Sequence, residues 1–168
     1  VTMNDVWTRN PDGPAMFDAM FYEPVATLHW LAPQTTLRLG IGTLILPFRE
    51  PILTGKMLAG LDRLSGGRLI IGAASGWVEA EFKALGVPFK ERGARSDEIL
   101  ELWNQCWTGT DPIAFDGKFH PFEGVHFQPR PVQKSPPIWI GGNSNAAIRR
   151  AVRFGQGWFP ASTTPEET

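Results

Sequence analysis

Short apolar segments alternate with amphipathic segments along most of the chain, and this alternation constrains the fold more than any other feature of the sequence. Residues 68–74, for example, are apolar without a polar alternation, which is typical of a strand buried on both faces. Strands that alternate with helices are parallel and are joined by crossover connections. We therefore predict five parallel strands, at residues 1–5, 37–46, 68–74, 137–141 and 157–160.

The segments between these strands carry helix signals. Pro51 stands where a first helical residue is expected, and Ser65-Gly66-Gly67 supplies a stop. Gly109 ends a longer helix, for which Ser96 is a candidate cap. We predict helices at residues 51–64, 77–85, 94–107 and 143–154.

Residues 111–136 break the alternation. The pair Asp116-Gly117 lies between aromatic-rich arms, which predicts a tight hairpin turn. Prolines make residues 128–137 extended, because a proline inside a helix removes a hydrogen bond and clashes with the preceding turn. We interpret residues 111–136 as an excursion between barrel units, within a single domain of residues 1–168.

Alternating strands and helices leave two architectures, a (β/α)₈ barrel and an open doubly wound sheet. A dinucleotide-binding sheet requires a Gly-x-Gly-x-x-Gly turn after its first strand, and the sequence has none there. A closed barrel needs eight strands and typically about 250 residues, whereas this chain has 168. We therefore expect an α/β fold, a partial (β/α)₈ TIM barrel with about five parallel strands that lacks the first and last barrel units.

Composition excludes several other classes of protein. A net charge of −1 argues against a nucleic-acid-binding surface, and no apolar run is long enough to cross a membrane. The single cysteine, Cys106, excludes an internal disulfide, fits a reducing cytoplasm and is expected to be a buried structural thiol. The sequence shows no Cys/His cluster, so we predict no metal site.

In a parallel barrel the active site lies at the carboxyl ends of the strands. The candidate residues at these positions are Asp5, then Gly42 and Thr43, then Ser75 and Gly76, and finally Gly141, Gly142, Asn143 and Ser144. The last group exposes backbone N–H groups at the positive end of a helix, which suits a phosphate, although two glycines can also make a plain tight turn.

The other candidates also have two readings each. Ser75 and Gly76 suit a flat ring or a plain turn, and Asp5 is either a surface residue or a polar group that faces the ring. The remaining polar residues are expected to be a solvated helix face or local salt bridges (Arg92, Arg95 and Glu98) or non-catalytic histidines (His29, His120 and His126).

Several stretches, taken in order and spacing, resemble the luciferase-like monooxygenase superfamily, especially its deazaflavin-dependent branch. These stretches are residues 37–43, 61–69, 91–95 and 136–142, together with Gly76-Trp77 and Glu81-Phe82. The resemblance implies a (β/α)₈ barrel that holds a reduced flavin, either FMN or coenzyme F420, at its carboxyl face. It also implies a possible homodimer.

The resemblance implies a role for each candidate group. Gly141, Gly142 and the residues that follow correspond to the phosphate-binding turn, and a non-proline cis peptide at Gly42–Thr43 would lie against the central ring. Ser75 and Gly76 would line the site, and the position of Asp5 is commonly acidic. Many deazaflavin members carry a histidine directly after that acid, where this sequence has Val6. We therefore assign no catalytic residue.

From the resemblance we expect hydride transfer between coenzyme F420 and a small organic substrate. The first alternative is an FMN-dependent monooxygenase that uses reduced flavin and oxygen. The second is a flavin-binding or structural subunit without catalytic activity.

Overall fold

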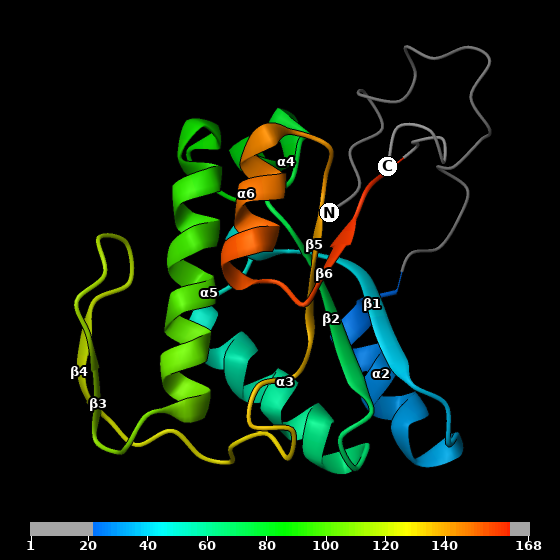
Figure 1. Cartoon of the computed structure of the whole chain (residues 1–168). Helices are drawn as coiled ribbons and strands as arrows, with labels where there is room; N and C mark the ends of the chain where they lie inside the picture. Colours follow the sequence, from blue (N-terminus) through cyan, green and yellow to red (C-terminus); the bar gives the residue numbers. More distant parts are fainter. Residues whose placement is uncertain (1–21, 162–168) are drawn as a thin grey trace, which may run out of the picture.

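The computed structural model describes residues 22–161, which are built around a parallel sheet of four strands (Figure 1). The order in the sheet is β1-β2-β5-β6, so neighbours in the chain are neighbours in space once the excursion between β2 and β5 is left aside. The strands are β1 (Leu39–Ile45), β2 (Leu69–Ala74), β5 (Ile138–Gly141) and β6 (Gly157–Phe159). Four of the five predicted strands are thereby confirmed, and the strand predicted at residues 1–5 lies outside the described residues.

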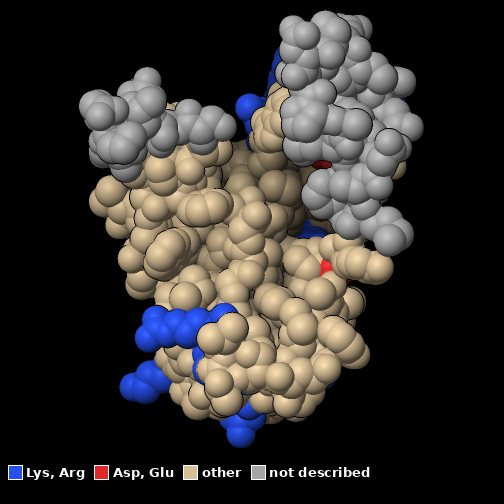
Figure 2. Space-filling model, turned by 90° about the vertical axis from the view of Figure 1, so that its right-hand side faces the viewer, with Lys and Arg blue, Asp and Glu red and all other residues tan. Residues whose placement is uncertain are grey.

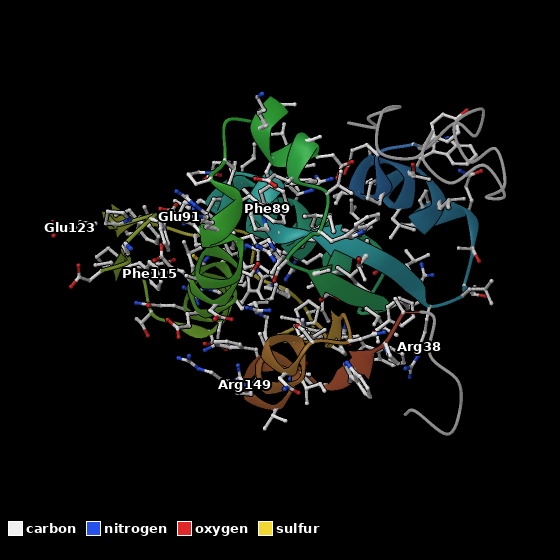
Figure 3. All side chains as sticks on the ribbon, turned by 90° about the horizontal axis from the view of Figure 1, so that it is seen from above. Arg38, Phe89, Glu91, Phe115, Glu123 and Arg149 are labelled. Carbon is white, nitrogen blue, oxygen red and sulfur yellow. The ribbon has the colours of Figure 1, made fainter. Side chains whose placement is uncertain are left out.

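Helices α3, α5 and α6 lie on one face of this sheet, and a small hairpin lies beyond α5 (Figures 1 and 3). The helices are α2 (Pro24–Leu31), α3 (Pro51–Leu64), α4 (Glu79–Ala84), α5 (Arg92–Thr108) and α6 (Asn145–Phe154). Single 3₁₀ turns occur at Ala32–Gln34, Leu46–Phe48 and Phe89–Glu91. The hairpin pairs β3 (Ile113–Phe115) with β4 (Phe122–Val125).

The predicted helices are present, with two corrections. Ser96 is not a cap, because α5 begins at Arg92 and the Ser96 hydroxyl donates a hydrogen bond to the Arg92 carbonyl at 2.7 Å inside the helix. Helix α2 was not predicted. Its start carries a clear signal, since the Glu23 carboxylate accepts the N–H of Ala26 at 2.6 Å and Pro24 occupies the first helical position.

The prediction of a tight turn at Asp116-Gly117 is wrong, because the second arm of the hairpin begins later in the chain than a two-residue turn would require. Phe115 is paired with Phe122, which leaves a connection of residues 116–121. A buried carboxylate explains this longer connection. Glu98 of α5 accepts the backbone N–H groups of Phe119 at 2.9 Å and of His120 at 2.8 Å, and this holds the loop against the helix.

Glu98 is therefore not part of a solvated helix face. Its side chain is buried, and it is also within 3.1 Å of Nδ1 of His120. The alternation of charges in α5 gave no sign of this, because the donors that Glu98 satisfies come from a segment more than twenty residues away. A buried carboxylate requires such donors, since an unpaired one is costly.

A second buried carboxylate anchors the end of the excursion. Asp62 of α3 is fully buried and accepts the backbone N–H groups of Val132 at 2.8 Å and Gln133 at 3.0 Å, and the side-chain amide of Gln133 at 2.7 Å. The chain that returns from the excursion is therefore fixed to α3 directly before it enters β5.

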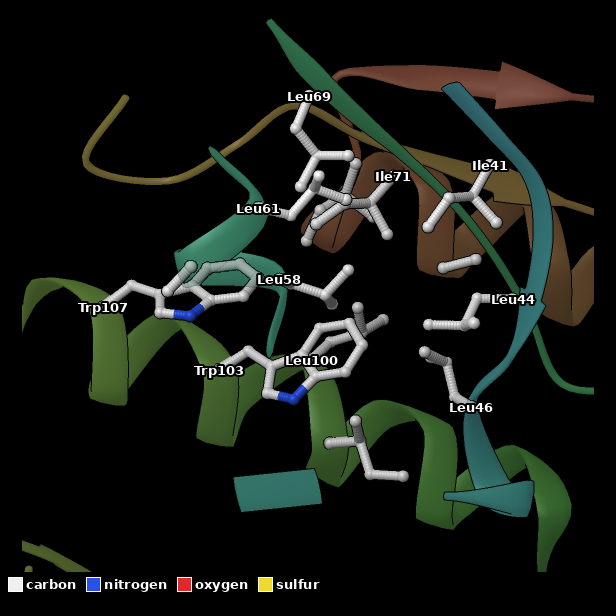
Figure 4. Packing of buried hydrophobic residues seen from close by; sticks show 14 of the residues in the cluster. Ile41, Leu44, Leu46, Leu58, Leu61, Leu69, Ile71, Leu100, Trp103 and Trp107 are labelled. Atoms are coloured by element: carbon white, nitrogen blue, oxygen red, sulfur yellow. The ribbon is translucent and has the colours of Figure 1, made fainter. Parts of the chain in front are cut away.

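The core lies between the sheet and helices α3 and α5 (Figure 4). Leu69 and Ile71 of β2 face Leu58 and Leu61 of α3 there, and all four side chains are fully buried. The indole N–H groups of two tryptophans in α5 find acceptors on α3, from Trp103 to the Pro51 carbonyl and from Trp107 to the Gly55 carbonyl. These bonds fix α5 to α3 while the rings stay in the core.

The opposite face of the sheet corresponds to the interior of a barrel, and glycine dominates it. Gly40 and Gly42 of β1 lie on this face, since Leu39 and Ile41 point into the core. Uncharged residues make up most of the visible centre of this side of the molecule, while Lys and Arg gather at its lower end (Figure 2). The lack of side chains at Gly40 and Gly42 leaves room for a flat molecule at β1.

Gly72 of β2, on the same face of the sheet, has a steric reason to be glycine. The register of β1 against β2 shifts between Ile41 and Leu44, and this bulge brings the Ile41 carbonyl oxygen over Gly72 of β2. That oxygen lies 2.0 Å from where a Cβ of residue 72 would be. Since a backbone atom cannot rotate away, the bulge requires glycine at this position.

We expect Gly72→Ala to lower the free energy of unfolding by about 3 kcal/mol or more, because the new methyl group meets backbone. The matched control is Gly40→Ala, on the same face of the sheet, where an added Cβ meets no atom of residues 22–161 within 4 Å. That variant should stay within about 0.5 kcal/mol of the parent. Chemical denaturation of the full-length protein measures both values. Equal losses in the two variants would contradict the steric argument.

Candidate functional site

The carboxyl ends of β1, β2 and β5 meet at the side chain of Thr43. Its methyl carbon lies 3.3 Å from the Cβ position of Gly72 and 3.1 Å from the Cβ position of Gly141. The structure therefore brings together the predicted residues Gly42, Thr43 and Gly141, which are distant in sequence. The Gly42–Thr43 peptide is cis, as the resemblance implied.

Ser75 follows β2 at the same end of the sheet. Its hydroxyl oxygen is buried and has no hydrogen-bond partner among the described residues. A buried hydroxyl normally has a partner, so this oxygen is available to a polar atom of a bound molecule.

Gly76 has a structural reason to be glycine. Its φ is +80°, and a Cβ there would lie 2.9 Å from side-chain carbons of Ile45 and Phe82. The tight packing of this turn against β1 and α4 therefore accounts for Gly76 without any ligand.

The turn between β5 and α6 presents backbone N–H groups. Of the two residues that could cap α6 from the sequence, Asn143 and Ser144, it is Ser144 that does so, since its hydroxyl oxygen accepts the N–H of Ala147 at 3.2 Å. Among the described residues, no acceptor lies within hydrogen-bonding reach of the N–H groups of residues 143–146. These groups stand at the positive end of a ten-residue helix, where an anion is favoured.

Asn143 has a structural role that the sequence did not reveal. Its side-chain N–H donates to the Ala161 carbonyl at 2.6 Å, and its side-chain oxygen accepts the Ala161 N–H at 2.8 Å. This amide thereby joins the loop after β5 to the loop after β6. These two bonds fix the orientation of the Asn143 side chain, and its backbone N–H has no acceptor among the described residues.

The sequence analysis missed the contribution of β6. The Trp158 indole donates to the Gly142 carbonyl at 2.8 Å, and the Gly142 N–H donates to the Phe159 carbonyl at 3.2 Å. Gly142 itself has a φ of +115°, which a residue with a side chain rarely adopts. The available signal was the aromatic pair at the end of a strand, directly opposite the glycine turn.

Helix α6 is held in place from behind by ion pairs with α5. Arg150 is buried and pairs with Asp97 at 2.6 Å, and it donates a second bond to the Gly93 carbonyl at 3.0 Å. Arg153 pairs with Glu101 further along the same two helices. The first turn of α6 is therefore positioned by bonds on its far side, which leaves its N–H groups unobstructed.

The remaining candidates are not brought to this site. Asp5 lies outside the described residues. His29 bonds to the Val25 carbonyl within α2, and His120 contacts Glu98 near the hairpin. Within residues 22–161, no group of three His, Cys, Asp or Glu side chains is arranged to hold a metal ion, and no helix is long and apolar enough to cross a membrane.

Comparison with known proteins places this geometry in context. Residues 4–168 match the family model described as luciferase-like monooxygenase. An FMNH(2)-dependent dimethylsulfone monooxygenase of Pseudomonas putida is 35% identical over 150 residues, which cover 86% of this chain and 41% of the relative. The chain thus spans less than half the length of this curated relative.

Two solved structures share the fold. The crystal structure of the monooxygenase RslO1 from Streptomyces bottropensis has a TM-score of 0.78 and 32% identity, over 86% of this chain and 45% of that one. The coenzyme F420-dependent tetrahydromethanopterin reductase from Methanopyrus kandleri has a TM-score of 0.75 and 26% identity, over 87% and 46%. The predicted partial (β/α)₈ barrel is confirmed.

Cys106 is a buried thiol, as predicted, and we expect it to be unreactive. Burial raises the pKa of the Cys106 thiol to about 11, so at about pH 8 only about one molecule in a thousand carries the reactive thiolate. Iodoacetamide at that pH should leave the Cys106 peptide unmodified in the folded protein and modify it in denaturant. Peptide mass spectrometry measures both. Rapid modification of the folded protein would contradict this assignment.

Proposed function

Because this chain belongs to the luciferase-like monooxygenase family, we propose that the full-length protein is an oxidoreductase that holds a reduced flavin or deazaflavin at the carboxyl ends of its strands. One observation carries the proposal. Three features occur together at this end of the sheet: the N–H groups before α6 and the buried Ser75 hydroxyl, which have no partner among the described residues, and the glycines of the strands beside them.

The turn from Gly142 to α6 fits the phosphate of the coenzyme. The N–H groups of residues 143–146 are exposed, point outward from a helix start and have no protein acceptor within residues 22–161. An anionic oxygen would satisfy several of them at once, and such charge-assisted bonds are about twice as strong as neutral ones. Gly141, Gly142 and Ser144 shape this turn, so their proposed role is to present backbone atoms.

The surface at Gly42 and Gly141 fits the flat ring, whereas Gly72 lies beneath the Ile41 carbonyl and shapes this surface from below. Thr43 projects over this surface, because its methyl group lies close to where side chains of residues 72 and 141 would begin if these residues were not glycine. The Ser75 hydroxyl can donate a hydrogen bond to a polar ring atom, which would remove its unsatisfied state. These residues bind and orient the ring and exclude water from one of its faces.

We place the FMN-dependent monooxygenase first, which reverses the order from the sequence alone. In support, the Pseudomonas putida relative is 35% identical and the Streptomyces monooxygenase 32% identical, against 26% for the F420-dependent reductase. Val6, at the position of the deazaflavin-branch histidine, points the same way. When bound, reduced FMN supplies the electron pair that activates oxygen, whereas F420 supplies it as a hydride.

Hydride transfer with coenzyme F420 is the second candidate. The reductase structure supports it, since its TM-score of 0.75 is close to that of the monooxygenase. The glycines of the strands and residues 142–146 carry no charged side chain, so these residues favour neither ring over the other. The substrate is proposed to be a small organic molecule in either case.

Oxygen uptake distinguishes the candidates. We expect the full-length protein, given reduced FMN and a panel of small sulfur compounds, alkanes and aldehydes, to consume oxygen faster with substrate than without. A protein that binds F420 and oxidises or reduces substrate without oxygen uptake would favour the second candidate. Bound flavin without any turnover across the panel would indicate a non-catalytic flavin-binding subunit. Failure to bind either coenzyme would refute the proposal.

We expect Gly142→Ala to weaken FMN binding about tenfold, or about 1.4 kcal/mol, and to leave riboflavin binding unchanged. The reason is that a side chain at φ +115° and 3.3 Å from the Ala147 methyl group displaces the turn that presents the N–H groups to the phosphate. The matched control is Gly124→Ala in the hairpin, at φ +70° and with no atom within 4 Å. Fluorescence titration measures both affinities. An unchanged FMN affinity in a folded Gly142→Ala protein would remove the turn from the site.

A further inference from the structure

An aromatic ring lies beside Gly42 and has no role in the account so far. Phe159 ends β6 in register with Gly141 of β5, so both residues project from the same face of the sheet. Two ring carbons of Phe159 lie 3.8 Å from the Cβ position of Gly42. The Phe159 ring therefore reaches over the interior face toward the Gly42–Thr43 peptide of β1.

The same residue also contacts the opposite half of the site. The Phe159 carbonyl accepts the N–H of Gly142, and the adjacent Trp158 indole donates to the Gly142 carbonyl. These two bonds fix the end of β6 to the turn before α6. The backbone of Phe159 therefore contacts the turn that is proposed to bind the coenzyme phosphate. Its side chain contacts the part of β1 that is proposed to lie against the coenzyme ring.

Phe159 remains 44% exposed, although its ring lies beside Gly42. One part of the ring contacts Gly42, and the rest is open to whatever enters above Gly42 and Gly141. An exposed apolar ring beside glycines favours a flat aromatic partner, because stacked or edge-to-face aromatic pairs are more favourable than the area they bury alone would make them.

We propose that Phe159 contacts the ring of the coenzyme and sets its position between the Gly42–Thr43 peptide and the phosphate turn. This inference rests on the proposed function, since it assumes that a flavin or deazaflavin occupies the surface at Gly42 and Gly141. Phe159 is a positioning residue for the ring, and Gly142 is one for the phosphate, so the two contributions to affinity are separable.

The experiment titrates riboflavin and FMN into the full-length protein and three variants, with flavin fluorescence as the readout. We expect Phe159→Ala to weaken both ligands by the same factor, about tenfold, and Phe159→Leu to weaken both by less. Phe159→Trp keeps an aromatic ring and should bind within about threefold of the parent. Thermal unfolding of each apoprotein identifies any variant that fails to fold, and Phe159→Leu serves if Phe159→Ala does not fold.

The titrations separate a failure of the Phe159 inference from a failure of the proposed function. Equal losses for riboflavin and FMN in Phe159→Ala or Phe159→Leu, with affinity retained in Phe159→Trp, support the inference. Unchanged affinities in a folded Phe159→Ala or Phe159→Leu protein overturn it while the proposed function stands. If the parent binds F420 and not FMN, the same comparison uses F420 and its phosphate-free deazaflavin fragment. If the parent binds none of these ligands, the proposed function itself fails.

Discussion

The Ile41 carbonyl oxygen occupies the space in which a side chain of residue 72 would have to lie, and the carboxyl end of the sheet depends on this close approach. The absence of a Cβ at Gly72 permits β1 to bulge toward β2, and the bulge turns Thr43 over the sheet. Thr43 then reaches Gly141 on the next strand, so three strands converge on one side chain. A single missing methyl group thus determines how the strand ends meet.

The two ends of the sheet are stabilised by different means. Near the amino ends of the strands, Asp62 satisfies donors from the returning excursion, and elsewhere on the helical layer Glu98 does the same for the hairpin loop. At the carboxyl end, hydrogen bonds join loop to loop, as between Asn143 and Ala161. Buried carboxylates therefore fix the excursion, whereas neutral groups join the loops of the candidate site and ion pairs hold α6 behind it.

Sequence patterns predicted what depends on local periodicity. The apolar runs of β1, β2, β5 and β6, the proline at the start of α3 and the serine cap of α6 all follow from neighbours in the chain. The pattern failed where a distant partner decides, as for Glu98 and the hairpin connection. The same limit applies to the bonds between Asn143 and Ala161 and to the position of Phe159 beside Gly42, because residues distant in the chain determine these contacts.

The phosphate turn and the surface at Gly42 and Gly141 consist almost entirely of main-chain atoms, and this determines which mutations they tolerate. A point mutation can remove a side chain, but it cannot delete a backbone N–H unless it introduces proline. A site built from main-chain atoms therefore tolerates many substitutions in the loops around it, provided that none of them introduces proline at the turn or a side chain at Gly72.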